Sequence, residues 1–151
     1  IARAESAQKL GNNTLSRTRF EQLLSQFPNN RAVILAYAES LLIQNEKASA
    51  LRAQEILRTL SNNSAEDVVF QRSFARAYEL SGNSLRAAEC YAEVAYLNGR
   101  VDDAINQLTA LMKNDDLDYY QRARVEARIA ELRPISLELE RQGIRAEDQG
   151  R

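Results

Sequence analysis

The sequence contains no histidine, no tryptophan, one cysteine, two prolines and five glycines among its 151 residues. Without histidine, the chain cannot supply the imidazole ligands of most zinc sites, the base of a serine or cysteine triad, or the usual acid–base shuttle. A single cysteine excludes a disulfide framework and metal sites built from cysteine alone. We therefore expect this chain not to be an enzyme and to carry no cofactor or metal of its own.

An excess of charge of one sign is also lacking. Twenty Lys and Arg residues stand against 21 Asp and Glu residues, which gives a net charge of −1 and no field that would draw the chain to nucleic acid or anionic lipid. The longest apolar runs, such as Ala32–Ala38, are far shorter than the ~20 residues that cross a bilayer. We expect neither nucleic-acid binding nor membrane insertion. Because the chain opens at Ile1 rather than Met, we interpret it as an excised domain or a processed product.

Good helix formers fill the stretches between the scarce breaks. Apolar residues recur at three- and four-residue spacing, as from Phe70 to Phe74 and Ala77, and no stretch alternates with the period of two typical of strands. Gly11 and Gly82 are each followed by Asn, which is typical of the left-handed residue that ends a helix. We expect an all-α fold with helices near 2–10, 14–27, 31–44, 49–61, 65–81, 84–97, 101–113 and 118–133.

A repeated pattern of small and large residues runs through these helices. Each small residue is followed four positions later by a large apolar one and three positions after that by another, as in Ala87, Tyr91 and Val94. The small residues Ser16, Ala53, Ala87 and Ala104 are 37, 34 and 17 residues apart. A helix–turn–helix period of 34 residues is that of the tetratricopeptide repeat. We predict a tetratricopeptide-like α-α superhelix, a right-handed solenoid of antiparallel helix pairs with about eight helices.

The repeat spacing divides the chain into one domain and a tail. We place the tetratricopeptide domain at 1–133, with repeats near 1–30, 31–67 and 68–98, a half-repeat at 84–116 and a capping helix at 118–133. The final step of 17 residues gives the helix at 84–97 a double role, as the second helix of one unit and the first of the next, which should change the superhelical path. Residues 134–151 are expected to form a disordered tail or a short helix that begins at Pro134.

The first helices of such an array line its concave side, so their outward residues form a candidate groove for a peptide, a helix or another domain. Leu42 and Tyr96 would be its apolar anchors. The alternative is a solvated face in which Arg72 and Arg76 pair with Glu89 and Glu93. The candidate partner-binding residues are Glu39, Leu42, Arg72, Arg76, Glu79, Arg86, Glu89, Glu93 and Tyr96.

Three other features are given structural roles. Cys90 stands beside Tyr91, which the repeat pattern directs into the core, so we expect a buried thiol rather than a reactive one. Arginines in the last helix alternate with Glu126 and Glu131, which indicates a salt-bridged face rather than a phosphate site. Its apolar stripe suits a helix that covers the open end of the array.

Two segments resemble a known family more closely than the repeat alone would require. They are Ala88–Leu108 and Tyr119–Leu132, and the second contains the motif Ala-Arg-Val-x-Ala-Arg-Ile. Both are similar to the tetratricopeptide domain of the periplasmic zinc metallopeptidases called β-barrel assembly-enhancing proteases. The likeness covers about residues 1–133.

The resemblance implies a parent protein with a separate catalytic domain, in which a His-Glu-x-x-His motif holds zinc. It also implies a periplasmic location, docking on that protease domain, and contact with the β-barrel assembly machinery or its outer-membrane clients. A free-standing tetratricopeptide scaffold or co-chaperone is the alternative. Another tetratricopeptide group clamps carboxyl termini with Lys and Asn, but the comparable positions here hold Glu39 and Arg76, which argues against that clamp.

Overall fold

A computed structural model describes residues 1–143, and these residues form eight α-helices and one short 3₁₀ turn, with no strand among them. The all-α prediction is confirmed. The predicted helix limits agree with the structure to within three residues, except at the end of the last helix. The elements are α1 (Ala2–Lys9), α2 (Asn13–Gln26), α3 (Arg31–Ile43), α4 (Lys47–Arg58), η1 (Ser61–Asn63), α5 (Val68–Ser81), α6 (Ser84–Leu97), α7 (Val101–Leu111) and α8 (Tyr119–Arg141).

Short polar residues define where these helices start and stop. The φ angles of Gly11 and Gly82 are +77° and +90°, in the left-handed region that side chains disfavour, and both lie just after a helix as the sequence predicts. Five helices begin with an Asn or Asp oxygen that accepts a first-turn N–H, namely from Asn12, Asn30, Asp67, Asn83 and Asp118. Side-chain caps of this kind stabilise a helix by about 1 kcal/mol each.

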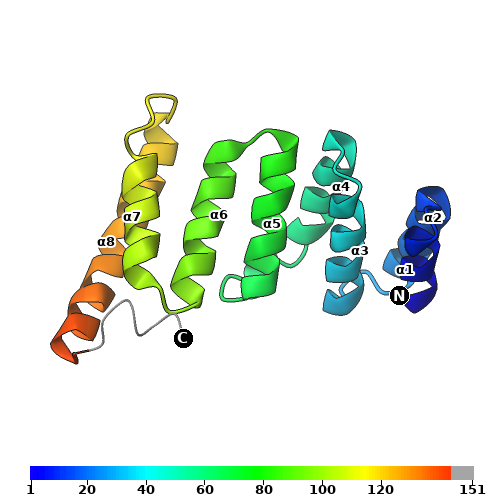
Figure 1. Ribbon diagram of the computed structural model, residues 1–151, viewed down its shortest axis with the longest axis horizontal. Helices are drawn as coiled ribbons and strands as arrows, with labels where there is room; N and C mark the ends of the chain where they lie inside the picture. Colours follow the sequence, from blue (N-terminus) through cyan, green and yellow to red (C-terminus); the bar gives the residue numbers. More distant parts are fainter. Residues whose placement is uncertain (144–151) are drawn as a thin grey trace.

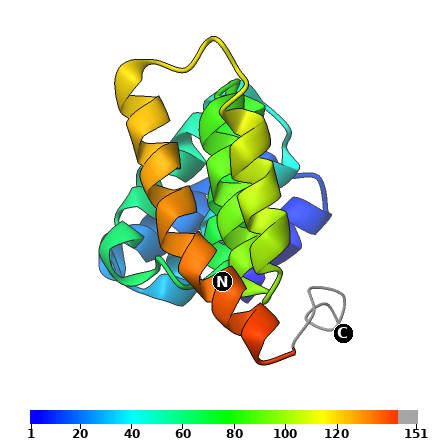
Figure 2. The same cartoon turned by 90° about the vertical axis from the view of Figure 1, so that its left-hand side faces the viewer.

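Successive helices pack against one another, so the molecule is an elongated array with α1 and α2 at one end and α7 and α8 at the other (Figure 1). The view onto the α7–α8 end shows these two helices side by side (Figure 2). Helix α3 packs on α5 as well as on α4, which is the contact expected between first helices of consecutive repeats. The chain is therefore an all-α, tetratricopeptide-like superhelix.

The array has two hydrophobic cores that meet at α6. The first core runs from α1 to α6 and includes Ala87 and Cys90, whereas the second joins α6, α7 and α8 and includes Ala92 and Ala95. Helix α6 packs on α5 on one side and on α7 on the other. The helix for which the sequence predicted a double role thus contributes to both cores.

The predicted end of the last helix is wrong. Helix α8 does not stop before Pro134 but continues to Arg141, and residues 144–151 lie outside the part of the chain that the structure describes. A proline lacks one backbone N–H, yet contacts beyond it hold the helix to its neighbours. Leu139 packs on the second core, and the Ser136 hydroxyl hydrogen-bonds to Asp102 of α7 over 2.5 Å. Tertiary contacts therefore outweigh the local break.

The expected orientation of Tyr91 is also wrong, whereas Cys90 is buried as predicted. The Tyr91 side chain is 36% exposed and donates its hydroxyl to Glu79 of α5 over 2.9 Å. Its place in the core is taken by the smaller neighbours Cys90 and Ala92, which face α5 and α7.

Among residues 1–143, no helix is both long enough and apolar enough to cross a membrane.

Candidate functional site

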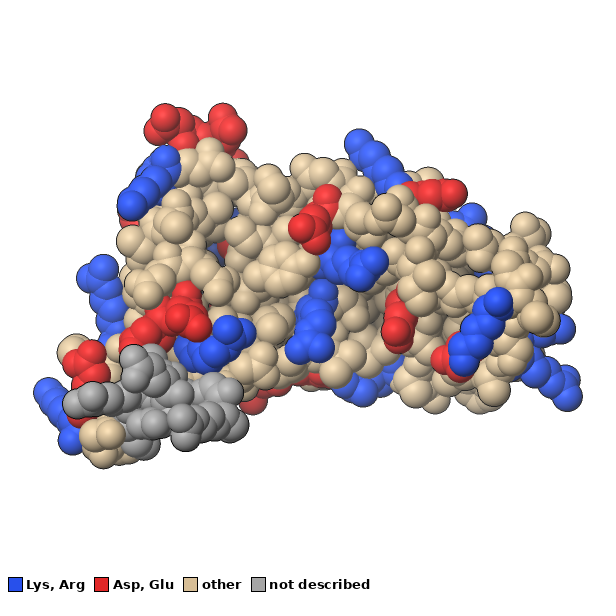
Figure 3. All heavy atoms as spheres, in the orientation of Figure 1, with Lys and Arg blue, Asp and Glu red and all other residues tan. Residues whose placement is uncertain are grey.

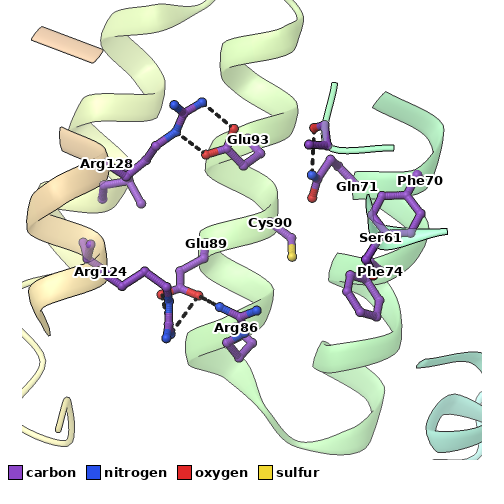
Figure 4. Close-up of a pocket in the computed structure, with 13 residues that line it drawn as sticks. Ser61, Phe70, Gln71, Phe74, Arg86, Glu89, Cys90, Glu93, Arg124 and Arg128 are labelled. Carbon is purple, nitrogen blue, oxygen red and sulfur yellow. Dashed lines mark hydrogen bonds and ion pairs between the residues drawn. The ribbon is translucent and has the colours of Figure 1, made fainter. Parts of the chain in front are cut away.

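A groove of about 340 Å³ opens between α5, α6 and α8 (Figure 4). Helix α6 forms its floor, with Cys90 at the middle, and the other two helices form its walls. The α5 wall carries Phe70 and Phe74, whose rings are 5.2 Å apart, together with the neutral amide side chain of Gln71. The loop that precedes α5 adds Ala65, and Val125 lies on the α8 side. The α5 wall is therefore aromatic and uncharged.

The opposite wall is a ladder of two ion pairs between α6 and α8. Arg124 Nη2 lies 2.8 Å from Glu89 Oε1, and Arg128 Nε lies 2.6 Å from Glu93 Oε1. The partners of both pairs are 35 residues apart. Equal spacing in both pairs means that α6 and α8 run in the same direction, about one repeat apart. The two ion pairs therefore hold the capping helix α8 beside α6, which forms the floor of the groove.

Each ion pair is extended by a further contact. Arg86 Nη1 donates to Glu89 over 2.6 Å, and the Arg86 guanidinium lies 5.5 Å from the centre of the Tyr78 ring. Arg128 donates to Glu131 over 2.8 Å and lies 4.9 Å from the centre of the Tyr96 ring. The hydrogen bonds that Arg128 donates to Glu93 are the main reason that the pKa of Arg128 is raised. The charged wall is thus held in place at both ends.

Cys90 does not provide a reactive group. Burial raises the pKa of its thiol to about 11, and the nearby positive charge of Arg86 offsets this only in part. The thiol is therefore protonated at neutral pH and contributes to the groove as a small apolar side chain.

The structure brings together only part of the predicted set of binding residues. Arg86, Glu89 and Glu93 line the groove side by side along α6, as their spacing predicts. Tyr96 lies one turn further on and packs under Arg128 rather than facing the groove.

Three other predicted residues lie on α5 but point away from the groove. Arg72, Arg76 and Glu79 are exposed, and Glu79 accepts the hydroxyl of Tyr91. Tyr91 and Glu89 are two positions apart on α6, which places them about 200° apart around the helix axis. The predicted surface is therefore split between two faces of the array.

The alternative interpretation, in which Arg72 and Arg76 form ion pairs with acidic residues of α6, is wrong as well. Glu89 and Glu93 pair with arginines of α8 rather than with Arg72 and Arg76. The carboxylates face α8 because both helices contribute to the second core, which brings α8 along the same side of α6. Their predicted partners extend into solvent from α5.

The last two predicted residues come from α3. Leu42 is buried in the first core and, unlike Phe70 and Phe74 of the same core, does not line the groove, so it is not a groove anchor. Glu39 lines a separate hollow of about 380 Å³ between α1 and α3, together with Gln8 and Lys9. Across that hollow, Gln8 donates to the Ser40 carbonyl over 2.9 Å.

The groove also contains residues that sequence reasoning did not select. In the sequence, Phe70 and Phe74 indicate only the apolar spacing of a helix, and Arg124 and Arg128 belong to the arginines that alternate with Glu126 and Glu131 in the last helix. One signal for the arginines was present: each stands 35 residues after a carboxylate of α6, close to the repeat period. No comparable signal marks the two phenylalanines, because the apolar pattern alone does not say which core residues border a groove.

Basic and acidic side chains alternate over the face of the molecule shown in Figure 3 without forming a patch of one sign. No protein-family model and no curated protein matches this chain. Within residues 1–143, no group of three or more His, Cys, Asp or Glu side chains is placed to hold a metal ion. The groove is thus one concave, part-apolar surface that the described residues offer to another molecule, and among the hollows described it is the one that contains three of the predicted binding residues.

Proposed function

We propose that this chain is a non-catalytic protein-interaction domain whose groove between α5, α6 and α8 receives a segment of another protein or of another domain of its own parent. One observation carries the proposal: an apolar wall faces a charged wall across a floor held in place by ion pairs. Binding sites for polypeptides and small ligands commonly combine an apolar lining with a few oriented polar groups. The elongated helical array provides a rigid frame for such a surface.

A narrower form of the proposal draws on the sequence likeness to β-barrel assembly-enhancing proteases. In this form, the chain docks on the zinc metallopeptidase domain of its parent in the periplasm and recruits partners or substrates during outer-membrane protein assembly and quality control. The zinc ion belongs to that catalytic domain, and the described residues offer no ligand set for it. A free-standing scaffold or co-chaperone would use the same groove without an enzymatic parent.

Site-specific photo-crosslinking in the full gene product tests the proposal. A photoreactive amino acid replaces Gln71, which lines the groove, or Gln107, which is exposed on α7 and lies outside the groove lining. We expect the probe at position 71 to form crosslinks to a polypeptide and the probe at position 107 to form few. Mass spectrometry of the crosslinked peptides then identifies the bound segment.

The identity of that segment separates the two forms of the proposal. Crosslinks to a His-Glu-x-x-His domain of the same polypeptide, or to an outer-membrane protein, support the protease-associated form. A gene that begins close to Ile1, with no such domain, supports a free-standing scaffold. Equal crosslinking from both positions would show that the groove is not the binding surface.

A further inference from the structure

The groove has a charge order along its length that restricts what it can bind. At one end, Arg86 and Arg124 share the single carboxylate of Glu89, so two positive groups face one negative group. Arg124 contacts Glu89 through Nε and Nη2, and its Nη1 has no hydrogen-bond partner among the described residues. This end therefore has one positive charge in excess and an N–H donor available for an acidic group.

The other end has the opposite balance. Arg128 lies between Glu93 and Glu131, so one positive group faces two negative ones. All three nitrogens of its guanidinium already donate, two to Glu93 and one to Glu131. Glu131 lies on α8 just outside the groove lining, and its side chain is 65% exposed, so a basic group of a ligand that extends past this end of the groove can reach it.

The two ends are about one helical turn apart. Glu89 and Glu93 are separated by four positions on α6, which corresponds to about 6 Å along the helix axis. In an extended polypeptide, residues i and i+2 point to the same side and are about 6.5–7 Å apart, while residue i+1 points to the opposite side. The opposite side of this groove is the apolar wall formed by Phe70 and Phe74.

From this geometry we infer that the groove binds an extended polypeptide segment in which one acidic and one basic residue flank one large apolar residue. The acidic side chain meets Arg86 and Arg124, and the basic side chain meets Glu93 and Glu131. The apolar side chain contacts Phe70, Phe74 and Cys90. This inference rests on the proposed function and specifies the chemistry of its ligand.

Selection from a random peptide library displayed on phage tests this inference with the whole chain as bait. We expect the enriched peptides to share an acidic–apolar–basic triplet, in either chain direction. In the variant Arg124→Glu, the positive end of the groove becomes negative, because one positive group then faces two negative ones. We expect selection on this variant to replace the acidic residue of the triplet by a basic one.

A matched variant controls for the change in net charge. Arg76→Glu makes the same substitution on the exposed face of α5 outside the groove lining, and we expect the original triplet to be selected unchanged. Arg124→Gln, which removes the charge without reversing it, serves if Arg124→Glu does not fold by circular dichroism. We expect it to weaken binding of an enriched peptide roughly three- to tenfold in a titration.

The outcomes separate the ligand chemistry from the proposed function. If no peptide is enriched, if the enriched peptides lack the triplet, or if Arg124→Glu selects the same peptides as the original chain, the inference is wrong. Crosslinks from position 71 to a segment without the triplet would also overturn it, while leaving the protein-interaction function in place. If the probe at position 71 forms no crosslinks to any polypeptide, the proposed function itself is wrong.

Discussion

At the residue scale, Ala87 shows how little space the helix contacts leave. Its side chain is 3% exposed and belongs to the first core, where α6 approaches α5. A leucine at this position adds three carbons to a packed site, so Ala87→Leu should lower the free energy of unfolding by roughly 1–3 kcal/mol. Chemical denaturation measures the change. Ala110→Leu, on an exposed position of α7, should shift stability by no more than about 0.5 kcal/mol, and equal effects of both changes would contradict this packing.

Cys90 provides a second prediction at this scale, which depends on pH. Because the pKa of its thiol is about 11, far above the ~8.5 of an exposed cysteine, its reactive thiolate is scarcer in the folded protein. We expect alkylation by iodoacetamide at about pH 7.5 to be roughly two orders of magnitude slower than in guanidinium-unfolded chain. The folded rate should keep rising with pH until about pH 11. Similar rates in the two states would contradict a buried thiol.

Single residues also show what the sequence can and cannot predict. The positions of Arg86, Glu89 and Glu93 followed from helical spacing, because α6 has distinct polar and apolar faces. Leu42 was misplaced because α3 carries apolar residues on its exposed side as well as on its buried side: Leu42 lies in the core, whereas Ile43 beside it is 60% exposed. A helix that is hydrophobic on most sides has no outward face that its sequence can reveal.

At the element scale, Glu21 holds three helices together. From α2, its carboxylate accepts the Tyr37 hydroxyl of α3 over 2.7 Å and the Arg52 Nη2 of α4 over 2.9 Å. Partial burial alone would raise the pKa of Glu21, but the hydrogen bonds from Arg52 and Tyr37 outweigh it, and the pKa lies below its ordinary value of 4.5. The charged form of Glu21 therefore stabilises the fold.

This stabilisation should depend on pH. Since the folded-state pKa is lowered, the contribution is present above the unfolded-state pKa and is lost as the pH falls through the folded value. Glu21→Gln should cost about 1 kcal/mol near neutral pH, and the gap to the original chain should narrow as the pH falls below the ordinary pKa of 4.5 and close below the folded-state pKa. Urea denaturation at several pH values measures it. As a control, Glu55→Gln removes a more exposed partner of Arg52 and should cost less stability. If the difference in free energy of unfolding between Glu21→Gln and the original chain does not change with pH, the charged Glu21 does not stabilise the fold.

Elements are predicted well where local chemistry determines them and poorly where distant contacts do. The start of α6 after its Asn83 cap is predicted to the residue, whereas α5 begins after its Asp67 cap, three residues later than predicted. The end of α8 is not predicted from the sequence, because Pro134 indicates a break that the packing of Leu139 on the second core overrides. The 35-residue pairing of α6 with α8 is intermediate: it is present in the sequence but is recognised only once the two helices are known to lie side by side.

At the scale of the whole molecule, the groove results from the way the repeats meet. Helix α6 packs on α5 and also on α7, and α8 then runs parallel to α6. The walls of the groove therefore come from different cores: Phe70 and Phe74 belong to the first, and Val125 of α8 to the second. The irregular 17-residue step in the repeat spacing thus coincides with the part of the array that offers a surface for binding.

The two cores should also unfold separately when one of them is weakened. In helical arrays each unit contacts only its neighbours, so a loss of packing affects nearby helices most. Val125→Ala, at a position 1% exposed in the second core, should reduce hydrogen-exchange protection of α7 and α8 more than that of α1 to α4. Ile34→Ala, at a position 0% exposed in the first core, should do the reverse.

Hydrogen exchange followed by mass spectrometry of peptides from each helix gives the comparison. A loss of about 2 kcal/mol in one core corresponds to roughly 30-fold faster exchange through its local opening, which leaves a clear contrast between the two ends of the array. Helix α6 should respond to both substitutions, because it contributes Ala87 to one core and Ala95 to the other. Equal loss of protection along the whole chain in both variants would mean that the array unfolds as one cooperative unit, and that the floor of the groove is not a joint between two separately stable parts.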